Sequence, residues 1–264
     1  PPLSDMRRLI LEEPVTRAAP WSLRLAWFSL AVVAIALVLV RDPRAETDAA
    51  MTVLVSGVGL AALAVLLALA AFVRIWREGA QGLRTAVGGL LLAALVLAYP
   101  AYMTARGVML PPLTDVSTDI ENPPAFSRSR AAWEARNWRL PRDSSPAARA
   151  LQREAYPQIA PLTLDLGPDE AFALALKAAQ NRKWQVVESY RPGGRVGNGR
   201  IEAVVRSRLL GLPYDVTVRL HPRADGTRID ARSSTRFGDR DYGQNADHIR
   251  AYLDEIGNLA LAVK

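Results

Sequence analysis

The side chains that most often transfer protons or bind metals are scarce in this 264-residue chain. It contains no cysteine and two histidines, His221 and His248. The lack of cysteine excludes disulfides, thiolate metal sites, iron–sulfur clusters and cysteine nucleophiles. Neither histidine has a second ligand at the spacing of a metal site, so we interpret both as surface or capping residues.

The glycine-rich and acidic segments form no recognisable catalytic motif. Residues 192–199 (PGGRVGNG) join two expected strands and precede no helix, so their amides cannot form a phosphate cradle at a helix N-terminus. Carboxylates are frequent, but no pair has a spacing that identifies a general acid. We therefore expect no catalytic residue, metal or cofactor and predict a protein that is not an enzyme. A hydrolase with an unfamiliar acid-based site is the alternative.

The positive charge of the chain comes mainly from arginine. The formal net charge is +7, and Lys177, Lys183 and Lys264 are the only lysines. There is no lysine-rich tail and no motif that reads a nucleic-acid groove, so no nucleic-acid partner is expected.

The apolar residues are concentrated in the first part of the chain. Three stretches lack charged side chains, at residues 25–40, 49–73 and 85–105. A membrane-spanning helix needs about 20 residues, and the first stretch reaches this length if it begins near Trp21, with Arg24 extending to the lipid headgroups. We therefore predict three transmembrane helices. Their uncharged centres argue against an ion or proton pathway within this chain.

Arginine asymmetry predicts the orientation of these helices. Seven arginines flank the ends assigned to the cytoplasm, and three flank the opposite ends: Arg7, Arg8, Arg17, Arg24, Arg74, Arg77 and Arg84 against Arg41, Arg44 and Arg106. The positive-inside rule then places the N-terminus in the cytoplasm and the C-terminal domain in the periplasm of a bacterial inner membrane. A cleaved signal peptide is the competing interpretation of the first segment, but no small-x-small cleavage pattern precedes Arg41.

Pairs of small residues recur at four-residue spacing in the second and third helices. They are Gly57 with Ala61, Ala64 with Ala68, and Ala94 with Ala98. Such pairs allow helices to approach closely. They indicate either packing of the three helices on one another or a contact with another membrane subunit.

Residues 111–126, here called the tether, leave the membrane. Paired prolines make this segment stiff and extended, while Val116, Ile120 and Phe126 predict that it docks on a protein surface. Its oxygen-rich side chains could bind calcium, but the spaced ligand loop with a turn glycine is lacking. Short helices are expected over about residues 129–137 and from Ser145 onward.

Alternating and helical periodicities predict a soluble α+β domain. We expect strands near residues 162–164, 184–190, 201–206, 214–220 and 229–233, with helices after Gly167 and after Asp241. The order β-α-β-β-β-β-α defines a two-layer domain, with helices on one face of a mostly antiparallel sheet. The predicted organisation is a cytoplasmic segment (1–20), a three-helix transmembrane anchor (21–108), a Pro-rich tether region with short helices (109–155) and the periplasmic domain (156–264).

The second face of this sheet is expected to be free and rich in arginine. The same strands place arginines among acids, namely Arg206, Arg208, Arg219, Arg232 and Arg236 with Glu202, Asp215 and Asp230. Cross-strand ion pairs are one interpretation, and binding of anionic headgroups or an acidic partner is another. The sheet and a helix could also enclose an apolar ligand, which a cavity above about 300 Å³ would favour.

Four blocks of the sequence resemble a known family. They are TDVSTDIENPPAF (114–126), YPQIAPL (156–162), DVTVRL (215–220) and RIDARSSTRFGDRDYGQNADHIRAYL (228–253). They are similar to the bacterial domain of unknown function 1499 family, over about residues 111–260. Some members of that family carry a membrane anchor. The resemblance implies a domain and not a reaction.

The resemblance also implies a set of candidate docking residues. They are Asp115, Ser117, Thr118, Asp119, Pro123, Pro124, Phe126, Arg232, Ser233, Ser234, Arg236, Asp241, Gly243, Asn245 and Arg250. The residues of this set from Arg232 to Arg250 surround one strand end and one helix start, where the tether could dock. We hypothesise that Arg232, Arg236 or Arg250 pairs with Asp115 or Asp119.

Two functions follow from this sequence. The first is a non-enzymatic inner-membrane protein that acts as an accessory or scaffold subunit of a larger complex. Its expected partners are membrane lipids and other integral membrane subunits. The alternative is a membrane-anchored periplasmic module that binds a lipid or another apolar molecule.

Overall fold

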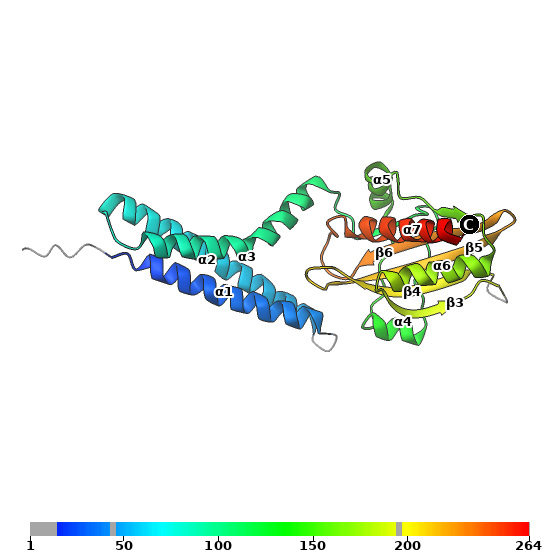
Figure 1. The fold of residues 1–264 in the computed structure, drawn as a ribbon, viewed down its shortest axis with the longest axis horizontal. Coiled ribbons are helices and arrows are strands. Elements are labelled where there is room, and N and C mark those ends of the chain that lie inside the picture. The colour runs from blue at the N-terminus through cyan, green and yellow to red at the C-terminus, as the bar shows by residue number, and fades with distance from the viewer. Residues whose placement is uncertain (1–14, 43–45, 194–196, 264) are drawn as a thin grey trace, which may run out of the picture. The chain divides into compact units, whose positions relative to one another are not determined.

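The computed structural model describes residues 15–42, 46–193 and 197–263, drawn in colour in Figure 1. The chain divides into two compact units, Pro1–Tyr102 and Met103–Lys264. Arg7, Arg8 and Arg44, which contribute to the predicted orientation, lie outside the described residues.

Among the described residues, three long apolar helices precede the strands of the second unit, as predicted. They are α1 (Ala18–Arg41), α2 (Thr47–Glu78) and α3 (Leu83–Met109). Their most apolar windows have mean hydropathies of 2.5, 2.6 and 1.8, and each helix is long enough to cross a bilayer. Helix α3 contains Pro100, and its last turns belong to the second unit.

Small residues bring α1 and α2 together within the chain. The Ser22 and Ser29 hydroxyls donate hydrogen bonds to the carbonyl oxygens of Ala64 and Gly57, each at 2.9 Å. The other members of these two small-residue pairs, Ala61 and Ala68, are also buried. Packing within the chain therefore explains two of the three pairs. The third pair differs because Ala94 and Ala98 remain exposed on α3.

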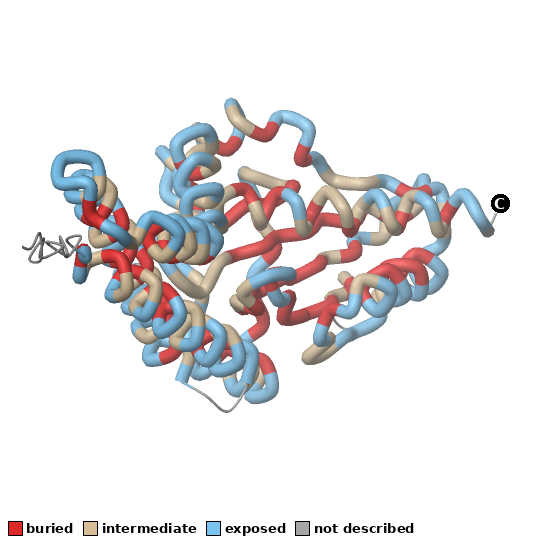
Figure 2. Tube along the Cα trace, turned by 60° about the vertical axis from the view of Figure 1, so that its left-hand side comes forward, coloured by how far each residue is buried: buried red, intermediate tan, exposed pale blue. Residues whose placement is uncertain are grey.

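The second unit is built around a six-stranded sheet. Its strands are β1 (Asp115–Ser117), β2 (Leu162–Leu164), β3 (Gln185–Tyr190), β4 (Gly199–Arg206), β5 (Pro213–Arg223) and β6 (Gly226–Thr235). The order is β1-β6-β5-β4-β3, with β2 also paired to β6, and every pairing is antiparallel. Figure 2 shows that the central strands are buried along most of their length.

Four helices accompany the sheet. They are α4 (Arg130–Ala135), α5 (Pro146–Ala155), α6 (Pro168–Asn181) and α7 (Gln244–Val263). The Ser129 and Ser145 hydroxyls accept hydrogen bonds from the first turns of α4 and α5, which confirms the predicted helix starts. Helices α6 and α7 pack beside each other on one face of the sheet (Figure 1). The α+β architecture is thus as predicted, with one additional strand, β1, supplied by the tether.

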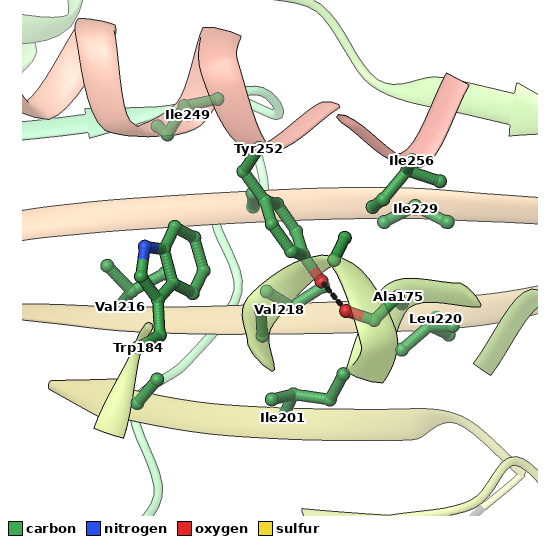
Figure 3. Close-up of a cluster of buried hydrophobic side chains, with 14 of the residues drawn as sticks. Ala175, Trp184, Ile201, Val216, Val218, Leu220, Ile229, Ile249, Tyr252 and Ile256 are labelled. Carbon is green, nitrogen blue, oxygen red and sulfur yellow. Dashed lines mark hydrogen bonds between the residues drawn. The ribbon is translucent and has the colours of Figure 1, made fainter. Parts of the chain in front are cut away.

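The core between the sheet and these two helices is filled by side chains (Figure 3). The rings of Trp184 and Tyr252 stack with centroids 4.4 Å apart. The Tyr252 hydroxyl donates a hydrogen bond to the Ala175 carbonyl oxygen at 3.0 Å. Isoleucines and leucines from the strands and α7, including Leu220 and Ile256, fill the remaining space. An apolar ligand expected between sheet and helices would have to displace these residues.

The opposite face of the sheet, here called the outer face, is not free as the sequence suggested. Glu202, Asp215, Asp230 and Arg232 on this face are all at most 3 % exposed. The tether and α4 cover them. Sequence periodicity identified which side chains share this face, but it could not show that a distant segment would fold back over it.

Candidate functional site

The tether joins the domain as an edge strand. Asp115, Val116 and Ser117 pair with Ser234, Ser233 and Arg232 of β6. Because side chains alternate along a strand, Val116 points into the core while Asp115 and Ser117 lie on the outer face. The site therefore begins with three consecutive tether residues that are buried together.

Arg232 is the central cation of the outer face. Its Nε lies 2.9 Å from Oδ1 of Asp115, and its Nη2 lies 2.8 Å from Oδ2 of the same carboxylate. The Phe126 ring lies 4.8 Å from the guanidinium carbon, within the range of a cation–π contact. Burial alone would lower the pKa of Arg232, but the hydrogen bonds and charge of Asp115 raise it instead. The hypothesised ion pair between Arg232 and Asp115 is confirmed.

A second ion-pair group lies over β4 and β5. Nη2 of Arg136 contacts Oε2 of Glu202 at 2.7 Å, and the backbone N–H of Ser127 donates to Oε1 at 2.8 Å. Arg236 contacts Asp215 at 2.7 Å. Burial raises the pKa of Glu202 above its usual value despite the charge of Arg136.

A third group fixes the middle of the tether. Asp119 accepts hydrogen bonds from Arg219 at 3.2 Å and Arg228 at 2.9 Å. Both arginines also contact Asp230, which is buried. Asp119 therefore pairs with two arginines that the hypothesis did not name. Thr118 adds a backbone contact, since its hydroxyl accepts from the Ala231 N–H at 3.0 Å.

The start of α7 is the remaining place where the tether docks on the domain. The Asp241 carboxylate accepts hydrogen bonds from the backbone N–H groups of Gly243 and Asn245, at 3.0 and 2.8 Å. The Asn245 side chain accepts from the Ser233 hydroxyl at 2.7 Å and donates to the Thr114 carbonyl oxygen at 3.1 Å. Burial raises the pKa of Asp241, although these N–H groups oppose the shift.

Most of the candidate docking residues therefore meet at the tether. The Pro124 carbonyl oxygen lies 3.3 Å from Nη1 of Arg232, and the Ser234 hydroxyl lies 3.3 Å from the Thr114 carbonyl oxygen. Pro123 lines a cavity beside Arg232. Arg250 is apart from this group, because it contacts Asp247 on its own helix at 3.1 Å.

Several residues of the network had no sequence signal. Arg136 cannot be distinguished by type from its neighbours Arg128 and Arg130 in the sequence. Gln152 of α5 holds the Ser117 backbone by two hydrogen bonds, at 3.2 and 2.7 Å, in the manner of a neighbouring strand. The strand pattern includes the acid on β4, Glu202, but only the fold identifies its partner, Arg136.

A cavity of about 390 Å³ lies between the tether, the segment before α5 and the outer face. Its lining is mixed. Polar groups come from Asp115, Ser117 and Arg232, and apolar surface comes from Phe126 and Leu140. Its volume exceeds the roughly 300 Å³ that would favour a bound ligand. However, the cavity lies on the outer face, whereas the ligand was expected between the sheet and a helix on the opposite face.

The two histidines show no catalytic arrangement. Nδ1 of His221 lies 2.6 Å from Oδ1 of Asn198. His248 was predicted to be a surface or capping residue, but it is only partly exposed: its ring packs edge-on against Tyr214 at 4.9 Å, and burial lowers its pKa to about 4. In the described parts of the chain, no three His, Cys, Asp or Glu residues gather in a way that could hold a metal ion.

In the described residues, these features define a protein with three potential membrane-spanning helices and an α+β domain whose outer face is covered by its own tether. A family model described as "Protein of unknown function (DUF1499)" matches residues 115–256, and the chain belongs to this family. No curated protein matches it. The matched region begins at the first residue of β1, so the family's domain includes the tether strand.

Proposed function

We propose that this protein is a non-enzymatic integral membrane protein that acts as an accessory or scaffold subunit of a larger membrane assembly. In this proposal, the N-terminus is in the cytoplasm and the α+β domain is in the periplasm of a bacterial inner membrane. The expected neighbours are membrane lipids and other integral membrane subunits, with no nucleic acid.

The pairing of the buried charges supports a non-enzymatic role. Asp115, Glu202, Asp215 and Asp230 each contact a guanidinium group. A general acid or base must reach a substrate. These four carboxylates are buried and held in ion pairs with guanidinium groups, so this network is better suited to fixing the tether in place.

The exposed surface of α3 supports a role in an assembly. Leu91, Ala94, Leu95 and Ala98 are exposed at helical spacing, and the two alanines form the small-residue pair that is not buried among the described residues. A second helix could approach this surface closely.

Site-specific photo-crosslinking in cells tests this proposal. A photoreactive amino acid at Leu95 should give a discrete crosslink to one membrane protein, which should also co-purify at a fixed ratio in mild detergent. The same amino acid at Leu66, which is similarly exposed on α2, is the control. Identical crosslinks at both positions, or none at Leu95, would contradict the proposal.

Protease protection tests the orientation. In the proposed topology, protease added to spheroplasts digests the C-terminal domain, whereas inverted vesicles protect it. The opposite pattern would reject a periplasmic domain.

The cavity beside Arg232 favours a second candidate function. A membrane-anchored module that binds a lipid or another apolar molecule needs a concave site of at least about 300 Å³ with a few convergent polar groups. The 390 Å³ cavity meets this requirement.

A further inference from the structure

The cavity beneath the tether has an apolar side and a cationic side. Ile120, Pro123, Phe126, Leu140 and Pro141 supply the apolar surface. The cationic side consists of three arginines, Arg128, Arg149 and Arg232. Two carboxylates, Asp115 and Asp143, also line it, so positive charge exceeds negative charge by one. This imbalance favours an anion over a cation.

Two of the three cavity arginines have their charge free for a ligand. Among the described residues, the side chains of Arg128 and Arg149 have no hydrogen-bond or ion-pair partner. In contrast, the arginines of the neighbouring groups, such as Arg136 and Arg219, each contact a carboxylate. Unpaired guanidinium groups at the edge of a cavity are suited to a carboxylate or phosphate group, which they can bind through two parallel hydrogen bonds.

One buried polar group of the cavity lacks a hydrogen-bond partner. Ser117 is 4 % exposed, and its hydroxyl has no hydrogen-bond partner among the described residues. Leaving a buried hydroxyl unpaired is costly. A ligand oxygen in the cavity could supply the missing partner.

The contacts of Arg232 show how an anion could enter. Its partner Asp115 has a side chain that is 5 % exposed, whereas the side chain of its other partner, Asp143, is 88 % exposed. Asp143 lies 3.0 Å from Nη2 of Arg232 and comes from the segment between α4 and α5. A solvent-exposed carboxylate gains little from such a contact, so a ligand anion could replace Asp143 without disturbing the buried pair.

We propose that this cavity binds an amphiphilic anion, a molecule with one carboxylate or phosphate group attached to an apolar chain. Arg128 and Arg149 bind the anionic group, which replaces Asp143 on Arg232, and Phe126 and Leu140 contact the apolar chain. This inference rests on the second candidate function above and is independent of any role as an accessory subunit.

Isothermal titration of the full-length protein in phosphatidylcholine nanodiscs tests the inference. Octyl phosphate and octanoate are the anionic probes, octanol tests the apolar chain alone, and inorganic phosphate tests the charge alone. We expect at least one anionic amphiphile to bind one site per chain, about tenfold or more tightly than both octanol and inorganic phosphate. The tighter of the two amphiphiles identifies the headgroup. If octanol or inorganic phosphate binds as tightly, the inference is wrong.

Matched variants locate the binding site. R128Q and R149Q should each weaken binding of the anionic amphiphile about threefold to tenfold. R130Q removes the same charge from an α4 side chain that is 87 % exposed and outside the cavity, and it should have no effect. Equal affinity of the R128Q/R149Q double variant and the unmodified protein would reject this cavity as the site.

A third variant blocks the cavity sterically. Ala125 is exposed and lines the cavity, so A125W should fill it with little cost to folding. We expect binding of the amphiphile to fall at least tenfold. If A125W and R128Q/R149Q both bind normally, the protein is a ligand-binding module with its site elsewhere. If no probe binds even the unmodified protein, the second candidate function itself fails.

Discussion

Replacing Asp115 with asparagine should leave the Arg232 guanidinium buried without its main counter-charge. Asp115 receives three contacts of 2.8–3.1 Å from Arg232, and both side chains are at most 5 % exposed. Removing one partner of a buried ion pair typically costs about 3–5 kcal/mol. Because Asp143 still contacts Arg232, we expect D115N to lower the free energy of unfolding by about 3 kcal/mol, the low end of this range.

Urea denaturation of the full chain in detergent, followed by circular dichroism, measures this loss. In a thermal experiment, a loss of this size corresponds to a fall in Tm of roughly 6–12 °C for a domain of this length. The exposed pair between Asp247 and Arg250, at 3.1 Å, is the control, and R250Q breaks it while leaving Asp247 in contact with Arg106. R250Q should cost less than about 1 kcal/mol.

A double-mutant cycle gives the decisive result. R232M alone should be as damaging as D115N, since it strands the Asp115 carboxylate in the same buried site. The double variant removes both charges and should therefore be less damaging than the sum of the two single changes by about 2 kcal/mol or more. Additive effects, within about 0.5 kcal/mol, would show that the two side chains do not stabilise the domain through each other.

Three further predictions concern other parts of the chain. In the first unit, a methyl group added at Gly89 would collide with Ser22, whereas one at Gly59 meets nothing within 4 Å. G89A should thus lower thermal stability in detergent by about 1–3 kcal/mol and G59A should not. Gly243 has a φ of +79°, and an added Cβ would lie 2.7 Å from Leu110, so G243A should destabilise the domain by at least about 1 kcal/mol in urea denaturation. Because burial lowers the pKa of His248 to about 4, the unfolded chain binds more protons than the folded chain between about pH 6.5 and 4. As the pH falls through this window, the free energy of unfolding of the unmodified protein should fall by up to about 3 kcal/mol relative to that of H248Q. If the two proteins lose stability in parallel with pH, the lowered pKa of His248 is wrong.

Local sequence signals predicted most of the elements in the second unit. Ser145 followed by Pro146 identified the start of α5, because a hydroxyl cap and a proline in the first turn are both local features. The strands near residues 201–206 and 214–220 were predicted from alternation, although β5 extends further, from Pro213 to Arg223. These features depend on neighbours in sequence, so they can be identified without the fold.

The covering of the outer face by the tether and α4 could not be predicted in the same way. Its contacts join residues far apart in the chain, such as Ser127 with Glu202 and Asp115 with Arg232. The charge pattern is equally compatible with a free basic surface and with a covered one. The resemblance to a family marked the polar positions of the tether, and only the fold showed that Arg136, Gln152 and Asp143 complete the network around them.

The edge strand β1 has a consequence for proteolytic shedding. The tether reaches the sheet before the chain continues to α4, and the segment between α4 and α5 has exposed residues such as Arg142 and Asp143. A protease that cuts there would separate the covalent chain into a helix-bearing fragment and a sheet fragment. The first fragment would keep β1 hydrogen-bonded to β6 and Asp115 paired with Arg232. We therefore expect the nicked halves to stay associated as complementing fragments, with release requiring denaturant and not cleavage alone.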